Sequence, residues 1–153
     1  MKPHPPKLKV NVPVEVLAHF EGLSLPSHQT EHASGVDLSA AEEITLAAGE
    51  RRLVPTGIKV AIPVGYEGQI RPRSGMALKS GVIIPNSPGT IDADYRGEIK
   101  VILWNLSNAD YPIKKGDRIA QMVLVPVVQI NWHPVESLDD TARGVGGFGH
   151  TGS

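Results

Sequence analysis

Prolines and glycines recur so closely along this chain that long helices have little room. The 153 residues include 13 prolines and 16 glycines. Proline lacks a backbone donor and glycine favours turns, so both end regular elements and leave short strands joined by turns. A chain of this length buries about two thirds of its unfolded surface around one core. We therefore expect a single all-β domain, arranged as a sandwich, jelly roll or barrel.

Apolar residues at every second position predict where several strands lie. In "KLKVNVPVEV" the alternation runs from Leu8 to Val16, as in a half-buried strand, and Pro13 places that strand at a sheet edge or bulge. "GIKVAIP" and "EIKVILWN" alternate in the same way, whereas "RIAQMVLVPV" is typical of a more fully buried strand. One short helix is predicted in "SGMALKSG", with Ser74 as its N-cap and Gly81 at its end.

The charge and the missing cysteines exclude several classes of function. The net charge is -1 and no basic run stands out, so the footprint of a duplex nucleic acid is absent and any bound anion should be small. Without cysteine there is no disulfide, thiolate zinc site or cysteine nucleophile, which suits a reducing compartment. The start lacks the apolar core of a signal peptide, and no apolar stretch approaches a bilayer span. We expect a soluble, cytoplasmic protein with no nucleic-acid or membrane partner.

Two motifs match known sites by their letters and fail on their context. "HQTEH", from His28 to His32, matches a zinc-protease pattern whose ligands converge only on a helix, and nothing around it is helical in period. "GVGGFG", from Gly144 to Gly149, matches a dinucleotide-binding turn, which needs a helix after it, yet only four residues follow. We expect a solvated loop at the first. The second lies in a polar, Gly-rich arm, residues 133–153, that follows a core of residues 1–132.

Two segments carry residues that suit a phosphate chain. In "RPRSGMALKSG" the Arg73 guanidinium, the Ser74 hydroxyl and the first helix amides could converge on phosphate, but the same letters fit a capped helix with a surface arginine. In "KKGDRIAQMV" the polar Gln121 stands among apolar residues of a predicted strand. Its amide is either satisfied by backbone or aimed into a site.

A third segment, "NSPGTIDADYRGE", combines an amide, two carboxylates and an aromatic ring. A turn at "PG" would make a hairpin with Asn86 facing Tyr95, and Asp92 and Asp94 would lie on one side of the returning strand. Such a hairpin could grip a base and activate a water, because carboxylates serve as general bases. The alternative is a plain hairpin with aspartates beside its turn.

Five segments in this order resemble the signature segments of the trimeric deoxyuridine triphosphatases (dUTPases): "ASGVDL", "PRSGMA", "NSPGTIDADYRGE", "GDRIAQMV" and "RGVGGFGHTG". The resemblance runs from about Val10 to the C-terminus. It implies a jelly-roll-like β-clip fold and a homotrimer with its active sites at subunit boundaries. It also implies an enzyme, a dUTP diphosphatase, that hydrolyses dUTP to dUMP and pyrophosphate with Mg²⁺. The reaction would limit uracil in DNA and supply dUMP for dTMP synthesis.

The resemblance also implies roles for single residues of this chain. Asp92, ahead of Asp94, would be the catalytic base that deprotonates the water attacking the α-phosphorus. Base and sugar would be bound by Asn86, Gly89, Thr90, Ile91, Tyr95 and Phe148, with Tyr95 excluding a 2′-hydroxyl. The triphosphate would be held by Arg73, Ser74, Gly75, Gln121, Arg143, Gly147 and Thr151. Asp37 and His150 would lie in the next layer of side chains, which supports these residues. Mg²⁺ would bind mainly phosphate oxygens and water, with no protein ligand assigned.

Two alternatives to this function stay open at the level of sequence. A dCTP deaminase, alone or bifunctional, shares the implied fold but carries a catalytic glutamate where this chain has Ile102, and its helix carries further Ser and Arg residues. A non-catalytic nucleotide-binding trimer would have lost base or phosphate residues, and those named above are present. The last segment departs from the family at His150, where a serine is usual.

Overall fold

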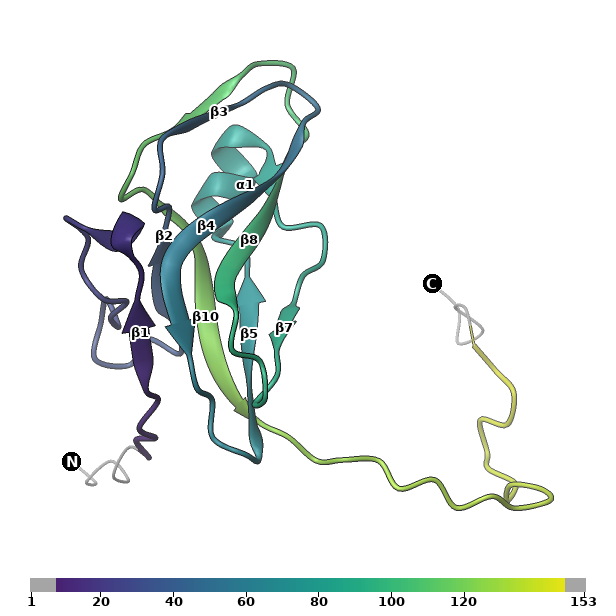
Figure 1. Ribbon diagram of the computed structural model, residues 1–153. Coiled ribbons are helices and arrows are strands. Elements are labelled where there is room, and N and C mark those ends of the chain that lie inside the picture. Colours follow the sequence, from purple (N-terminus) through teal and green to yellow (C-terminus); the bar gives the residue numbers. More distant parts are fainter. Residues whose placement is uncertain (1–7, 148–153) are drawn as a thin grey trace, which may run out of the picture.

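The computed structural model describes residues 8–147 as a β body with a long extended tail (Figure 1). Its main strands form two four-stranded sheets, in which every neighbouring pair is antiparallel. The first sheet has the order β1 (Val14–Val16), β4 (Arg51–Val60), β8 (Glu98–Asn105), β6 (Val82–Ile83). The second has the order β2 (Val36–Ser39), β10 (Arg118–Pro126), β5 (Tyr66–Arg71), β7 (Gly89–Ile91).

Four smaller elements complete the body. Strands β3 (Ile44–Leu46) and β9 (Tyr111–Ile113) pair with each other, a 3₁₀ turn η1 (Ala18–Phe20) follows β1, and the helix α1 (Ser74–Ser80) follows β5. In Figure 1 the sheets wrap around a common interior, with α1 near one end of the body. The all-β, jelly-roll-like fold with one short helix in the described residues is therefore confirmed.

One hydrophobic core joins the two sheets. Val54 and Ile99 from the first sheet and Leu38 and Ile119 from the second are at most 1% exposed and belong to one cluster. Along β8 the buried positions alternate, as "EIKVILWN" predicts. The prediction for β10 was wrong over most of its length, since only Ile119 and Ala120 are fully buried and the later residues are half-buried. Strand β10 pairs with β2 on one edge and with β5 on the other, but its C-terminal end lies where the body meets the tail and is less covered there.

Two local predictions need correction. The N-terminal strand is limited to β1, and Val14 and Val16 are 42% and 53% exposed, because this edge strand pairs with β4 alone and nothing in the described chain covers it. Ser74 is the first residue of α1 rather than its N-cap, which is the extended Arg73, without a side-chain capping bond. The helix ends at Gly81 as predicted, where φ is +65° and the amide reaches the Ala77 carbonyl.

A buried asparagine ties the end of β8 to two other segments. Asn105 is fully buried; its Nδ2 donates to the carbonyls of Leu46 and Ala109, at 3.0 and 2.8 Å. Its Oδ1 accepts from the amide and the hydroxyl of Ser107, at 3.0 and 2.7 Å. Every polar atom of the side chain is thus satisfied, as burial requires.

Replacing this side chain, as Asn105→Ala, is expected to lower the free energy of unfolding by about 2 to 4 kcal/mol, because buried carbonyls lose their donor. Urea unfolding followed by circular dichroism measures the loss as a lower midpoint. Asn108→Ala, at an exposed neighbouring position, is the control and should shift stability by less than about 0.5 kcal/mol. Equal losses in the two variants would contradict this role of Asn105.

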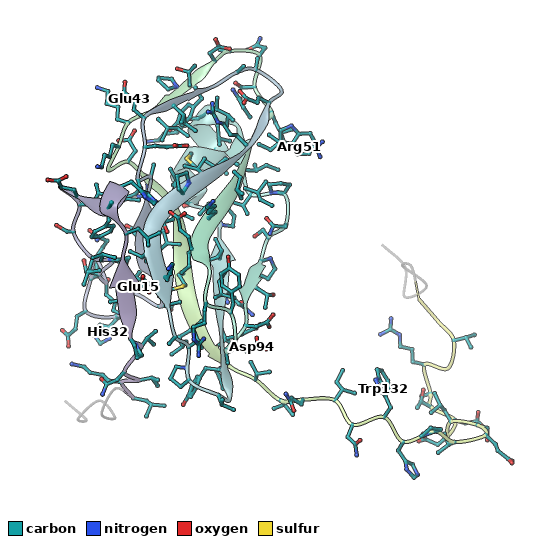
Figure 2. All side chains as sticks on the ribbon, in the orientation of Figure 1. Glu15, His32, Glu43, Arg51, Asp94 and Trp132 are labelled. Atoms are coloured by element: carbon teal, nitrogen blue, oxygen red, sulfur yellow. The ribbon has the colours of Figure 1, made fainter. Side chains whose placement is uncertain are left out.

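The chain leaves the β body after Val127, whose amide donates to the Gly65 carbonyl at 2.9 Å. From there it runs clear of the body to residue 147, and Trp132 lies far out on this tail in Figure 2. Several of its apolar side chains are uncovered; Val128, Ile130, Trp132 and Leu138 are each at least 73% exposed. Among residues 8–147 no helix is long and apolar enough to cross a membrane.

Candidate active site

A pocket of about 280 Å³ lies where β7 and the segments around it meet β8. Its lining has an apolar part, which we call the floor, and a remainder that is mostly polar, which we call the rim. The floor is made by Leu53, Ile70, Ile84, Val101 and Ile102. The rest of the lining is Asn86, Gly89, Thr90, Ile91, Asp92, Tyr95, Glu98 and Lys100. The structure thus brings together the predicted base-binding residues within its described part and the predicted catalytic base. Phe148 lies outside the described residues.

The segment that carries these residues is not the predicted hairpin. Strand β7 pairs with β5, where Gly89 lies opposite Ile70 and Ile91 opposite Gly68, instead of folding onto a partner arm of its own. β5 is long enough to pair with the whole of β7, whereas the segment before Pro88 is too short to do so. The Ser87–Pro88 peptide bond is cis. Asn86 still reaches the same pocket as Tyr95, so the two residues meet there by a different route.

The two aspartates of this segment face different surroundings. Both follow the end of β7, in a turn in which the Tyr95 amide donates to the Asp92 carbonyl at 3.1 Å. Asp92 lines the pocket, and it also borders a neighbouring hollow with Glu67. Asp94 borders only that hollow, at the lower end of the body in Figure 2. They are therefore not a pair on one side of a strand, and Asp92 is the carboxylate nearer the apolar floor.

Tyr95 is held at the pocket rim by the residues that follow it. Its hydroxyl donates to the Glu98 carbonyl at 3.0 Å, and its ring lies so close to Gly97 that an added methyl there would overlap the hydroxyl. The Glu98 carboxylate accepts hydrogen bonds from the Gly57 amide, at 2.9 Å, and from His19 Nε2, at 2.5 Å. Sequence reasoning did not select Glu98 or His19, because they are 79 residues apart and carry no shared motif.

The Glu98 carboxyl is ionised more readily than usual. Burial by itself raises the pKa of Glu98, but the hydrogen bonds from His19 and the Gly57 amide, with the charges of His19 and Lys100, lower that pKa below its ordinary value. A lowered pKa in the folded state stabilises the fold above the ordinary carboxyl pKa. That contribution is lost as the pH falls through the lowered pKa.

A second polar cluster lies across β2, β10 and the start of α1. Asp37 contacts two arginines there: its Oδ1 lies 3.5 Å from Arg73 Nε, and its Oδ2 accepts from Arg118 Nη1 at 3.1 Å. Arg73 also donates to the Arg118 carbonyl at 3.1 Å. Gln121 lies opposite Asp37 in the ladder and donates to the Pro72 carbonyl at 3.1 Å, so backbone satisfies its amide nitrogen. Arg118 was missed by sequence reasoning, although it stands in the quoted segment "GDRIAQMV".

The two groups of candidate residues are separate within one chain. Neither Arg73, Ser74, Gly75 nor Gln121 lines the pocket. Arg143 and Gly147 lie on the tail, where Arg143 Nε donates to the Gly146 carbonyl at 2.8 Å. His150 and Thr151 fall outside the described residues.

No metal-binding cluster is evident between residues 8 and 147, where no three His, Asp or Glu side chains lie close enough to hold an ion. The "HQTEH" stretch forms bends and turns instead of a helix, and His28 Nδ1 lies 3.1 Å from the Gly35 carbonyl.

Comparison with known proteins points to one family. A family model described as dUTPase matches residues 21–152. A deoxyuridine 5′-triphosphate nucleotidohydrolase from Maricaulis maris is 50% identical over 148 residues, which is 94% of this chain and 97% of that protein. The protein of the same name from Rickettsia bellii is 57% identical over 143 residues, covering 92% of this chain and 95% of that protein.

Solved structures give the same answer for the fold. A mutant dUTPase of Staphylococcus bacteriophage 80alpha, solved with dUpNHpp, has a TM-score of 0.86 and 26% identity, covering 95% of this chain and all of that one, 100%. A mutant dUTPase from phage phi11 of S. aureus, which coordinates a structural Mg(II) ion, has a TM-score of 0.78 and 25% identity, covering 86% of this chain and 100% of that one.

Proposed function

The chain belongs to the dUTPase family, a family of hydrolases, and from this premise we propose how its own residues convert dUTP to dUMP and pyrophosphate. The observation that carries the proposal is the pocket in which Asn86, Asp92 and Tyr95 meet over an apolar floor. It combines a shape for a base, a polar edge to read it and a carboxylate beside it, which are the parts that selective hydrolysis of a nucleotide needs.

The pocket is proposed to select uracil and deoxyribose by fit. The Asn86 amide can both donate to and accept from a base edge, and Ile70 and Ile84 give the base ring an apolar surface. At Gly89 an added Cβ would lie 3.2 Å from Asn86 Nδ2 and 3.4 Å from Ile70, so the strand approaches these residues closely. Tyr95 at the rim packs against the sugar and leaves no room for a 2′-hydroxyl. A tight, rigid pocket of this kind discriminates by exclusion.

Asp92 is the proposed catalytic base. Asp92 lines both the pocket and the neighbouring hollow, so we propose that it lies between the base and the space beyond the sugar. From there it can accept a proton from a water that attacks the α-phosphorus in line with the departing pyrophosphate. Asp94 borders only the hollow and is the weaker candidate.

The triphosphate is proposed to lie against Arg73, Ser74, Gly75 and Gln121. The Asp37 carboxylate holds Arg73 and Arg118 side by side, which orients their guanidinium groups before a nucleotide binds. Fixed cations and amides that face the β- and γ-phosphates withdraw charge from the leaving pyrophosphate as it develops. Arg143, Gly147, Thr151 and Phe148 would reach the nucleotide from the tail, with His150 behind them.

The active site is proposed to be completed by other copies of the chain in a homotrimer. Two observations support this assembly. The base pocket and the Arg73 cluster share no lining residue in one chain, and the tail carries uncovered apolar side chains away from its own body. Lying on neighbouring copies would cover those side chains. Residues 1–132 then form the nucleotide-binding core, and residues 133–153 form the arm that closes over a site.

Mg²⁺ is proposed to assist by neutralising charge on the triphosphate. The donor set of the described chain fits an ion of this kind, since Mg²⁺ retains water and binds substrate phosphates with few protein ligands. Asp92 and Glu98 both line the pocket, and because the Glu98 carboxylate is bonded to His19 and the Gly57 amide, Asp92 is the carboxylate proposed to approach the ion. We further propose that the protein acts in the cytoplasm, where removing dUTP limits uracil in DNA and supplies dUMP for dTMP synthesis.

The test is pyrophosphate release from dUTP in the presence of Mg²⁺, measured beside dTTP, UTP and dCTP. Release is expected from dUTP at least about 100-fold faster than from the other three, because each analogue adds a group that the pocket excludes or changes the edge that Asn86 reads. Release from all four would make the protein an unspecific pyrophosphatase. Saturable dUTP binding without pyrophosphate would favour the non-catalytic trimer.

Deamination of dCTP is the second candidate to be excluded by this assay. Ile102, which takes the place of the deaminase's glutamate in the aligned segment, lines the pocket floor. A hydrocarbon side chain cannot transfer a proton, so ammonia release from dCTP should stay at background. Ammonia release from dCTP would contradict the conclusion that a chain with Ile102 at this position cannot deaminate.

A further inference from the structure

We propose that His19, acting through Glu98, is a positioning residue for Tyr95 and thereby sets how strongly the enzyme prefers deoxyribose over ribose. The proposal rests on the function proposed above and adds to it a residue outside the five signature segments. His19 touches no pocket residue other than Glu98 in the described hydrogen bonds. Its effect would therefore pass through contacts between three elements, η1, β4 and β8.

The first contact is a bulge in β4. The register between β4 and β8 shifts between Pro55 and Lys59, and within this interval Gly57 has φ of +74°. Its amide is thereby turned out of the ladder and donates to the Glu98 carboxylate, while its carbonyl accepts from the Leu17 amide at 2.9 Å. Bulges commonly re-aim groups beside active sites. Here the bulge holds η1 on one side and Glu98 on the other.

The second contact is the hydrogen bond from His19, on η1, to the same carboxylate. The Glu98 side chain is only 12% exposed, so a carboxylate there needs donors, and Gly57 and His19 supply them. Lys100 Nζ lies 3.7 Å from the other carboxylate oxygen, whereas Lys59, opposite Glu98 in the ladder, pairs with Glu15 of β1 at 3.1 Å. Of these neighbours, His19 is the one that hydrogen-bonds the Glu98 carboxylate from η1, next to Leu17, whose amide donates to the Gly57 carbonyl.

The third contact runs from Glu98 to the ring of Tyr95. Tyr95 is 43% exposed, so its own burial fixes it poorly, and the described bond that holds its hydroxyl is the one to the Glu98 carbonyl. That carbonyl belongs to the first residue of β8, beside the bulge where the ladder is interrupted. Glu98 pairs with Lys59 at the edge of this interruption, and its side-chain bonds to Gly57 and His19 add further ties that keep the carbonyl in place. Loosening them lets the ring move and admits a 2′-hydroxyl.

The experiment compares kcat and KM for dUTP and for UTP in the full-length protein and in four variants. His19→Ala is expected to lower the preference for dUTP over UTP, as a ratio of kcat/KM values, by about tenfold, the scale of one hydrogen bond to a charged group. The loss should lie mainly in KM for dUTP and in a gain with UTP, with kcat for dUTP within about twofold. His19→Gln keeps an N–H donor at similar reach and should restore most of the preference.

The control is Glu15→Gln, which breaks an ion pair on the neighbouring strands without reaching Tyr95 and should leave the ratio unchanged. Gly97→Ala adds a methyl group that would overlap the Tyr95 hydroxyl. It should therefore lower the ratio even if the His19 variants fold poorly. An unchanged ratio in either His19→Ala or Gly97→Ala, in a wild-type enzyme that prefers dUTP, would overturn this proposal alone. A wild-type protein without any dUTP preference would overturn the proposed function, and this proposal with it.

Discussion

Asp92→Asn is expected to cut dUTP hydrolysis by about 100- to 10,000-fold, the usual contribution of a general base, while dUTP binding stays close to that of the parent chain. The substitution keeps the size and shape of the side chain at the pocket, so the apolar floor and Asn86 are undisturbed. The amide cannot accept a proton from water. Single-turnover pyrophosphate release gives the chemical step, and isothermal titration with a non-hydrolysable dUTP analogue gives the affinity.

The matched control is Asp94→Asn, which makes the same chemical change two residues away. Asp94 borders the neighbouring hollow and not the pocket, so its variant should keep turnover within about threefold of the parent chain. A near-native rate in Asp92→Asn would move the base elsewhere. If instead the Asp94 variant lost the larger share of the rate, the assignment of the two aspartates would have to be exchanged.

Deleting residues 142–153 is expected to leave a folded trimer whose turnover falls by at least about 100-fold, since the deletion removes several groups that would face the triphosphate, and a single such donor is worth about that much. The described part of this segment lies beyond the β body, and the last strand ends at Pro126, so no core contact is lost. Size-exclusion chromatography with light scattering gives the assembly, and pyrophosphate release gives the rate.

Arg143→Ala in the full-length chain separates the contribution of charge from that of the whole arm. It should lose part of the rate that the deletion loses, with the urea midpoint of both proteins near that of the parent chain. A truncated chain that fails to fold would show that the segment is structural. A truncated chain with parental turnover would remove the arm from the proposed active site.

Local patterns predicted the parts of this fold that depend on neighbours in sequence. The alternation in "EIKVILWN" predicts the buried face of β8, and Gly81 predicts where α1 ends, because both follow from local geometry. The hairpin around Asn86 was wrong because strand pairing is a competition among distant segments, and β5 provides β7 with a longer partner. The exposure of β1 likewise depends on what covers it and not on its own alternation.

The candidate site likewise combines residues that are neighbours in sequence with contacts between segments that are distant in sequence. Asn86, Asp92 and Tyr95 come from one segment whose letters suggested a shared site, and the pocket brings them together. The contacts of Asp37 with Arg73 and Arg118 could not be read from sequence, since they join residues of β2, β10 and the start of α1. The same holds for His19 on η1 and Glu98 on β8, which a bulge in β4 brings together. What sequence lacked in each case was the register between strands.

The ring of Tyr95 rests where any side chain at residue 97 would have to be. During the evolution of such a chain, residues 95 and 97 can therefore not be substituted independently of each other. A mutation that gives residue 97 a side chain displaces the ring before any replacement of the tyrosine can compensate, whereas loss of the tyrosine first makes the glycine dispensable. Substitutions at these two positions are therefore coupled, and the order in which they arise decides whether the tyrosine ring is displaced.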